Sequence, residues 1–409
     1  MRSGWETLRI GDLGDCRRGV SYKSPDDLRH EENDETVRLL RSTNIQSGRV
    51  VLEDVQVVDA ATHEEADVLQ TGDVVICIAN GSRNLVGKAA RFRQPDKRKY
   101  VVGAFCARFR PRVAGEADFV AYLFESRGYR HWIRVLLGGT NISNLKPSDI
   151  LACPLRVPAG GDERGVVARI LGRWDVAIDE ASALLVAQRA RKLGLMQQLL
   201  MGRTRFREFR GEPWRTVRIG SLLEECDRYV AWSDDTAYRF ASIRRRSGGL
   251  FDRGTFHGRE VKTKVLKLLK AGDFVISKRQ VVHGAWAMVT KAFDGFGVSD
   301  EYDVLVNRDP KVLDMRFFDY LSQTRRLWHM AFLASNGVHI EKLIFDFDDF
   351  AKEKVRIPPT VREQAKIVDV LSACDREIGL LGKQLAGLRE QKEGLMQKLL
   401  TGEVRVKTG

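Results

Sequence analysis

Three residues in the second half of the chain have the types and the loose spacing of a metal-dependent nuclease. Asp252, Glu260 and Lys262 fit a D…E-x-K pattern, in which two carboxylates hold Mg²⁺ and the lysine polarises the attacked phosphate. The pattern is common by chance, and a run of further lysines follows it. Phosphate contact by the lysines is therefore the favoured interpretation, and a stand-alone Mg²⁺-dependent nuclease is the minor alternative.

Other patterns typical of enzymes are incomplete. The segment from Gly81 to Lys88 resembles a phosphate-binding loop, but its glycines are one residue too far apart and Ala89 lacks the Mg²⁺-binding hydroxyl. The six cysteines form no C-x-x-C pair, and the seven histidines show no ligand spacing beside them, which predicts neither a disulfide framework nor a zinc site. We therefore expect no catalytic residue, no metal and no cofactor on this chain.

The composition predicts a basic protein that binds a polyanion. The 409 residues carry 68 Lys and Arg against 55 Asp and Glu, a formal charge of +13. At this length we expect two or three domains. No apolar run is long enough for a membrane helix and the first residues have no signal-peptide core, so a cytoplasmic protein is expected.

Basic residues gather in two segments that also carry side chains able to read base edges. Seven basic residues and one acid lie between Arg83 and Lys99, and eight basic residues and two acids lie between Arg253 and Arg279. Asn, Ser, Gln and His residues are interleaved with them, which favours nucleic acid over a merely solvated surface. The residues that we expect to contact nucleic acid are Arg41, Asn44, Asn80, Ser82, Arg83, Lys88, Arg244, Arg245, Arg246, Lys262, Lys264, Lys278, Arg279 and His283.

An internal repeat organises the whole chain. Residues 157–206 align with residues 357–406 at a constant offset of 200, with 16 of the 50 positions identical. Upstream, the segment from Trp5 to Gly11 recurs from Trp214 to Gly220, and a Gly-Asp pair at position 72 recurs at position 272. The chain is therefore interpreted as two copies of one unit, each with a variable body followed by a better-preserved tail.

Each tail is predicted to be one long helix, because its apolar residues follow a 4-3 spacing. Pro158 and Pro358 precede the helices, and Gly202 and Gly402 stand where the helices should stop. About 40 residues at a rise of ~1.5 Å make a rod of about 60 Å. The narrow apolar seam indicates a coiled coil. Its predicted seam residues are Val167, Leu171, Trp174, Ile178, Leu185, Leu195, Leu199, Ile367, Leu371, Ile378, Leu381, Leu385, Leu388, Leu395 and Leu399.

The connectivity predicts how these parts are joined. A compact second body releases the chain near the point where it entered, so the second helix should return antiparallel to the first, giving a pseudo-two-fold arrangement. Short apolar runs in the bodies predict strands, and 119–137 and 315–334 are the better helical candidates. We expect an α+β fold of two mixed α/β bodies joined by an antiparallel coiled coil. The expected boundaries are body one 1–156, helix one 157–206, body two 207–356, and helix two with a tail 357–409.

These features together resemble the specificity subunit of type I restriction-modification systems, over essentially the full length. The resemblance rests on the paired Trp…Ile-Gly openings, the paired Gly-Asp turns, the segment Gly138–Leu145, the proline-rich helix starts and the Gly-Leu-Met-Gln-x-Leu-Leu helix ends. In the second copy, residues 258–278 resemble one recurring class of target recognition domain. The first copy departs from the pattern at residues 159–164, so its helix is expected to begin later or to contact its partner differently.

The resemblance implies a non-catalytic role. Two target recognition domains would read the two halves of an interrupted DNA target, and the helices would act as a spacer and dock two modification subunits. Those subunits would methylate adenine with S-adenosylmethionine, and two restriction subunits would supply ATP- and Mg²⁺-dependent translocation and cleavage. The competing interpretation is a scaffold protein whose coiled coil joins two protein-binding bodies. Binding to DNA and to neighbouring gene products separates the two.

Overall fold

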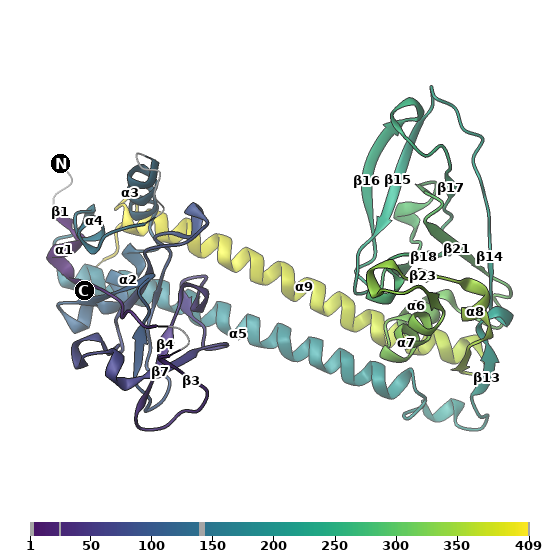
Figure 1. Cartoon of the computed structure of the whole chain (residues 1–409), viewed down its shortest axis with the longest axis horizontal. Coiled ribbons are helices and arrows are strands. Elements are labelled where there is room, and N and C mark those ends of the chain that lie inside the picture. Colours follow the sequence, from purple (N-terminus) through teal and green to yellow (C-terminus); the bar gives the residue numbers. More distant parts are fainter. Residues whose placement is uncertain (1–3, 24–25, 139–143, 408–409) are drawn as a thin grey trace. The chain divides into compact units, whose positions relative to one another are not determined.

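The computed structural model describes residues 4–23, 26–138 and 144–407, which divide into two compact units. Unit 1 comprises residues 1–183 and 383–409, and unit 2 comprises residues 184–382. Two long helices, α5 (Gly161–Leu199) and α9 (Val361–Leu400), contribute to both (Figure 1). We call the rest of unit 1 head 1 and the rest of unit 2 head 2. None of the described helices is both long and apolar enough to cross a membrane.

The heads are built from short strands and shorter helices, which accords with the mixed α/β content expected from the sequence. The strands of head 1 are β1 (Trp5–Arg9), β2 (Gly14–Arg18), β3 (Leu28–Arg29), β4 (Thr36–Leu40), β5 (Ile45–Gln46), β6 (Arg49–Val50), β7 (Gln56–Asp59), β8 (Val74–Cys77), β9 (Ala89–Arg91), β10 (Tyr100–Val102), β11 (Cys106–Pro111) and β12 (Pro154–Pro158). Its helices are α1 (Ile10–Leu13), α2 (Ala117–Leu123), α3 (Arg127–Gly138) and α4 (Pro147–Leu151).

The strands of head 2 are β13 (Arg215–Arg218), β14 (Leu223–Glu225), β15 (Ala237–Ile243), β16 (Leu250–His257), β17 (Lys267–Leu268), β18 (Phe274–Ser277), β19 (Trp286–Met288), β20 (Gly297–Val298), β21 (Tyr302–Asn307), β22 (Ser335–Asn336), β23 (Ile344–Phe345) and β24 (Lys354–Ile357). Its helices are α6 (Met315–Ser322), α7 (Arg325–Leu333) and α8 (Phe347–Lys352).

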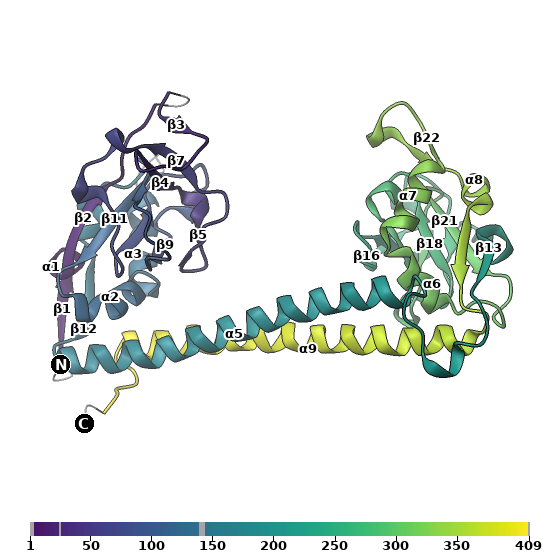
Figure 2. The same ribbon diagram turned by 90° about the horizontal axis from the view of Figure 1, so that it is seen from below.

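Both heads share one layered plan. The central sheet of head 1 has the order β2-β11-β8-β9-β6-β5, and that of head 2 has the order β14-β21-β18-β19, so four strands correspond one to one. Helices α6 and α7 cover one face of the head 2 sheet (Figure 2), where Phe274 and Ile276 enter the core. Val275 and Val304 point to the other face, against the sheet β16-β15-β20-β17. The alternation of β18 side chains therefore fills two cores.

The Gly-Asp pairs serve the same turn in both heads. Gly72 and Gly272 have φ values of +99° and +98°, a left-handed conformation that glycine adopts at little cost. The next residue closes the turn: Asp73 accepts from the backbone N–H of Gln70 at 2.8 Å, and Asp273 from that of Lys270 at 2.7 Å. An arginine then neutralises each buried carboxylate, Arg110 in head 1 and Arg228 in head 2. This repeated motif is structural.

The two longer helices expected within the heads are each divided in two. The sequence pattern predicts single helices over 119–137 and 315–334, whereas α2 is separate from α3 and α6 from α7. A hydroxyl at each break explains the difference. Ser126 Oγ accepts from the N–H of Tyr129 at 3.2 Å, and Thr324 Oγ1 accepts from that of Leu327 at 3.5 Å, so each side chain caps a new helix.

Within each unit, the start of one long helix lies against the end of the other. In unit 1, Val167 and Leu171 of α5 share a core with Leu399 of α9. In unit 2, Leu199 of α5 shares a core with Ile367 and Leu371 of α9. All of the predicted seam residues are buried or half-buried. The helices are therefore antiparallel within each unit.

The chain after each helix fastens the start of the other. Arg205, beyond α5, makes a two-pronged ion pair with Glu363 at 2.8 Å for both oxygens. Arg405, beyond α9, pairs with Glu163 at 3.2 and 2.8 Å.

The expectation of a later helix start in the first copy is wrong, because α5 and α9 begin at equivalent positions, 161 and 361. Arg164 compensates for the altered sequence by donating to the Pro158 carbonyl and pairing with Glu6 and Glu116.

A glycine and a tryptophan meet at the end of each long helix. Gly202 and Gly402 have φ values of +66° and +69°. A Cβ on Gly202 would lie 3.1 Å from the ring of Trp214, and one on Gly402 would lie 2.9 Å from that of Trp5. The tryptophans that open the two copies thus cover the helix ends, which explains why the two motifs recur together.

Candidate nucleic-acid interface

The arginine cluster of head 2 forms a tight turn between strands β15 and β16. Arg246 and Ser247 have φ values of +58° and +52°, so the chain reverses through left-handed residues. The N–H groups of these two residues donate to the carbonyls of His283 and Gly284 at 2.7 and 2.8 Å. The turn is therefore fixed by main-chain bonds to the loop that follows β18.

Side chains add a second connection between these two loops. Arg245 Nε donates to Gln280 Oε1 at 2.7 Å, and the Arg244 guanidinium lies 4.7 Å from the ring centroid of Phe251. The Arg246 side chain is exposed, and no hydrogen bond or ion pair joins it to another side chain within the described part of the chain. The structure thus brings the predicted residues Arg244 to Arg246 next to His283, although almost 40 residues separate them in sequence.

The neighbouring basic residues of the same loop are already paired. Lys278 Nζ lies 3.1 Å from Asp303, which is almost fully buried, and burial raises the pKa of that carboxyl. Arg279 contacts Glu301 at 2.5 and 3.4 Å on the surface. Surface pairs of this kind are weak, so Arg279 can exchange its partner for a phosphate at little cost.

Lys262 and Lys264 lie apart from the arginine turn. The pairing of β15 with β16 runs from Ile243 and Leu250, beside the turn, to Ala237 and His257 at the opposite end. Both lysines follow that opposite end, where Lys264 pairs with Asp234 at 2.8 Å and Lys262 is exposed. Figure 1 shows the hairpin extending away from α6 and α7. Head 2 therefore presents two basic groups, one at each end of its longest hairpin.

The geometry does not assemble the nuclease pattern. Asp252 lies near the arginine end of β16, where it pairs with Arg239 at 2.8 Å, and that hydrogen bond lowers its pKa. Glu260 lies beyond the other end and accepts from the N–H of His257 at 2.8 Å. The length of a strand separates the two carboxylates, and in the described ranges no cluster of His, Cys, Asp and Glu could hold a metal ion.

Head 1 joins its predicted residues in the same way. The loop after β4 contains Arg41 and Ser42, and the loop after β8 contains Asn80 and Ser82. Asn80 Nδ2 donates to Ser42 Oγ at 3.4 Å, and Asn80 Oδ1 accepts from the N–H of Ser82 at 2.9 Å. These are the counterparts of the loops after β15 and β18 in head 2, where Arg245 contacts Gln280. The same junction is therefore built twice.

The other predicted residues of head 1 differ in how accessible they are. Ser82 and Arg83 are exposed and Lys88 is half-buried. Arg41 donates to the carbonyl and the carboxylate of Asp54 at 3.0 and 2.8 Å. Asn44 is only 1% exposed, and its amide group bonds to backbone carbonyls at 3.0 and 3.2 Å. Its position supports a structural role in the turn and not contact with a ligand.

Sequence reasoning missed an exposed aromatic residue in head 1. Phe105 is 67% exposed and lines a groove of about 520 Å³ together with Tyr22, Arg41 and Thr43. A single phenylalanine in an apolar run looks like a core residue, so its sequence gives no signal of exposure. Of the resemblance segment Gly138–Leu145, residues 139–143 lie outside the described ranges.

Comparison with known proteins confirms the resemblance seen in the sequence. Residues 211–390 match the family described as "Type I restriction modification DNA specificity domain". The chain is 29% identical over 324 residues to the type I restriction enzyme StySPI specificity subunit of Salmonella potsdam, covering 79% of this chain and 65% of that protein. It is 28% identical over 183 residues to the EcoKI specificity subunit of Escherichia coli K12, covering 45% of this chain and 39% of that protein.

A solved structure shares the fold. The S subunit of a type I restriction-modification system from M. genitalium superposes with a TM-score of 0.55 at 12% identity, covering 97% of this chain and 96% of that one. The chain thus spans about two thirds of one curated relative and two fifths of the other, while its fold matches a specificity subunit over nearly its whole length.

Proposed function

We propose that this chain is the DNA sequence-recognition subunit of a type I restriction-modification complex. Each head reads one half of a bipartite target, and the two helices, as an antiparallel coiled coil with pseudo-two-fold symmetry, set the spacing between the heads. The observation that supports this most directly is the junction that occurs in both heads, Ser42 with Asn80 and Arg245 with Gln280.

The chemistry of these loops suits base reading. Exposed arginine, serine and amide groups can form the paired hydrogen bonds that distinguish bases in the major groove. A charge of +13 spread over both heads and helices gives each head only modest affinity for DNA phosphates. Two linked heads therefore gain affinity mainly because binding of the first raises the effective concentration of the second.

The proposed partners carry the chemistry. Two modification subunits dock on the helices and bring S-adenosylmethionine, and restriction subunits join through them with ATP and Mg²⁺. This chain is non-catalytic in that scheme, and such a complex would act in the cytoplasm. The scattered carboxylates of the nuclease pattern are consistent with this division.

Co-expression with a modification subunit of a type I system from the same genome tests the proposal. We expect the purified complex to methylate adenine at a bipartite sequence, identified by methylation-sensitive sequencing of the host DNA, and this chain alone to methylate nothing. Mg²⁺-dependent cutting by the isolated chain, or a complex that retains other proteins but no DNA, would contradict it.

A further inference from the structure

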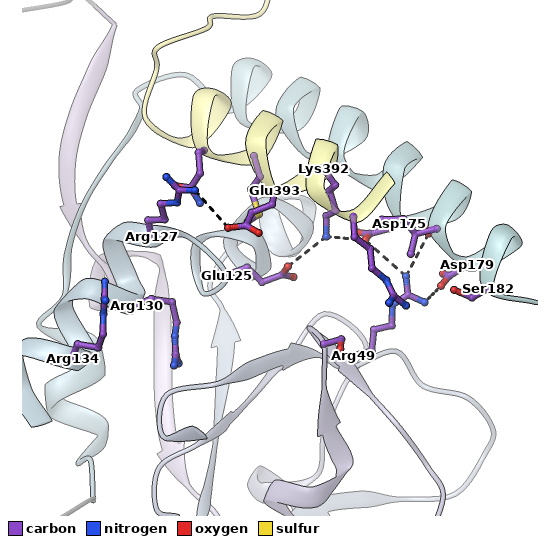
Figure 3. Close-up of a pocket in the computed structure, with 15 residues that line it drawn as sticks. Arg49, Glu125, Arg127, Arg130, Arg134, Asp175, Asp179, Ser182, Lys392 and Glu393 are labelled. Atoms are coloured by element: carbon purple, nitrogen blue, oxygen red, sulfur yellow. Dashed lines mark hydrogen bonds and ion pairs between the residues drawn. The ribbon is translucent and has the colours of Figure 1, made fainter. Parts of the chain in front are cut away.

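Unit 1 contains a partly buried polar joint where its head and both long helices meet. Tyr122 of α2 donates its hydroxyl to Asp175 of α5 at 2.5 Å. Lys392 of α9 contacts the same carboxylate at 2.8 Å and lies 5.1 Å from the tyrosine ring centroid (Figure 3 shows the lysine and the aspartate). The lysine side chain is 13% exposed. We call these three residues joint 1.

Unit 2 contains the same joint with the roles of the helices exchanged. Tyr320 of α6 donates to Asp375 of α9 at 2.7 Å. Lys192 of α5 contacts Asp375 at 2.6 Å and lies 5.3 Å from the tyrosine ring centroid. The aspartates and the lysines of the two joints are each 200 residues apart, the offset of the repeat. We call these residues joint 2.

The joints place charges where a coiled coil usually has apolar residues. Both lysines continue the 4-3 spacing of the seam. Removing a lysine from most of its water costs free energy that attraction to a partly exposed aspartate only partly offsets, so such pairs are poor devices for stability. A polar pair inside a seam is instead known to specify register, because only one alignment satisfies it. Burial and the neighbouring aspartate raise the pKa of each tyrosine, which keeps its hydroxyl a donor.

The register argument can be followed residue by residue. A slip of one heptad keeps the spacing of the apolar seam, but it places Lys392 opposite Ala168 or Ser182 and Lys192 opposite Val368 or Gly382. Each slipped alignment separates a largely buried lysine from its aspartate, since the side chains of Lys392 and Lys192 are 13% and 16% exposed. Seven residues at ~1.5 Å per residue correspond to a shift of about 10 Å, or about three base pairs of DNA.

We propose that the two joints are spacing-determining positions: they hold each head in one alignment on the helix pair and so restrict the complex to one half-site spacing. The inference rests on the proposed function. Because the tyrosines belong to the heads, the joints act on the orientation of each head as well as on the helix register.

The two joints differ in their surroundings. Joint 1 has added ion pairs, since Lys392 also contacts Glu125 at 3.4 Å and Arg49 of β6 pairs with Asp179 of α5. Around joint 2, Asp319 is half-buried and accepts from the N–H of Met288 at 2.9 Å. Loss of joint 2 is therefore expected to weaken the attachment of head 2 to the helices more than loss of joint 1 weakens that of head 1.

The test removes both charges of a joint, so that neither the lysine nor the aspartate is left without its partner. The variants are Lys192→Met with Asp375→Asn, Lys392→Met with Asp175→Asn, and all four changes together. The control is Lys383→Met, since Lys383 is exposed on α9 and makes no ion pair within the described ranges. Each chain is purified with its methyltransferase partner and assayed on targets whose spacer is native, or one or three base pairs longer or shorter.

We expect the preference of the four-fold variant for the native spacer to fall by about tenfold, with the melting temperature little changed and the half-site sequences unaltered. The charge-exchanged joint 2, Lys192→Asp with Asp375→Lys, should keep more of the preference than the neutral joint 2 variant, Lys192→Met with Asp375→Asn. A folded four-fold variant that keeps the wild-type preference, or a control with the same loss, would overturn the inference alone. A wild-type complex that methylates no bipartite target would instead overturn the proposed function, and this inference with it.

Discussion

The two heads share their framework but not the surface that their loops present. In head 1, the N–H of Ile78 donates to the carbonyl of Phe105 at 2.9 Å, and in head 2 the N–H of Lys278 donates to that of Glu301 at 3.0 Å. The main chain is thus the same at these positions. An exposed phenylalanine stands on one head, where the other has a glutamate paired with an arginine.

Comparison of the two heads separates the residues that determine the fold from the loop residues that can differ between the heads. The helix starts and the Gly-Asp turns recur in both copies because packing requires them, and the Tyr-Asp-Lys joints recur at the offset of the repeat. The loops after β4 and β8, and after β15 and β18, keep their junction while changing their chemistry. On the proposed function, the two heads therefore read different half-site sequences.

The largest expected effect comes from lengthening the framework itself. Inserting four helical residues after Gln188 and four after Leu388 lengthens each helix by about 6 Å. We expect methylation of the native target to be lost and a target with a longer spacer and unchanged half-sites to replace it. Sequencing of methylated host DNA measures this, and an unchanged methylated sequence would contradict it.

The second prediction concerns the ion pairs at the helix starts, which are equivalent but unequally buried. Both glutamates are buried, but Arg205 is only 14% exposed, so Arg205→Ala should lower the free energy of unfolding of unit 2 by about 3 kcal/mol. Arg405 is 44% exposed, and solvent screens its ion pair, so Arg405→Ala should cost unit 1 less than Arg205→Ala costs unit 2. Hydrogen exchange at the first turns of α9 and α5 measures the two effects separately. Equal losses would show that burial does not distinguish the pairs.

The third prediction separates the heads. Arg245→Ala should relax methylation at one base pair of one half-site by about 10-fold to 100-fold, as expected for loss of a bidentate contact to guanine. The other half-site should stay as selective as before. Methylation rates on singly substituted targets measure this, and a uniform loss at all positions would identify Arg245 as a phosphate contact.

The smallest effect is expected at the far end of the head 2 hairpin. Lys262→Ala should weaken DNA binding by a few fold on all sequences and lower its salt dependence by about one counterion. Gel shifts at several salt concentrations, with Arg245→Ala as the comparison, check this. A change in base preference would move Lys262 into the reading surface.

The repeat made the architecture predictable, whereas the details of the site were not. Offset pairs such as Trp5 with Trp214 showed that one fold occurs twice, and the 4-3 spacing located both long helices to within a few residues. The helix breaks at Ser126 and Thr324 were not predicted, because a single hydroxyl is a weak signal within an amphipathic stretch. The exposure of Phe105 and the burial of Asn44 depend on contacts between distant segments, which composition does not reveal.

Main-chain hydrogen bonds hold the arginine turn in place, and this affects how its side chains can change in evolution. The turn is attached to its neighbouring loop through the amides of Arg246 and Ser247, and these bonds do not depend on which side chains the turn carries. Replacing those side chains by residues that are not β-branched leaves the path of the loop intact, because Arg246 and Ser247 are left-handed. On the proposed function, a lineage can therefore acquire a new recognition sequence by single substitutions, and an engineer can do the same, without first having to stabilise the protein.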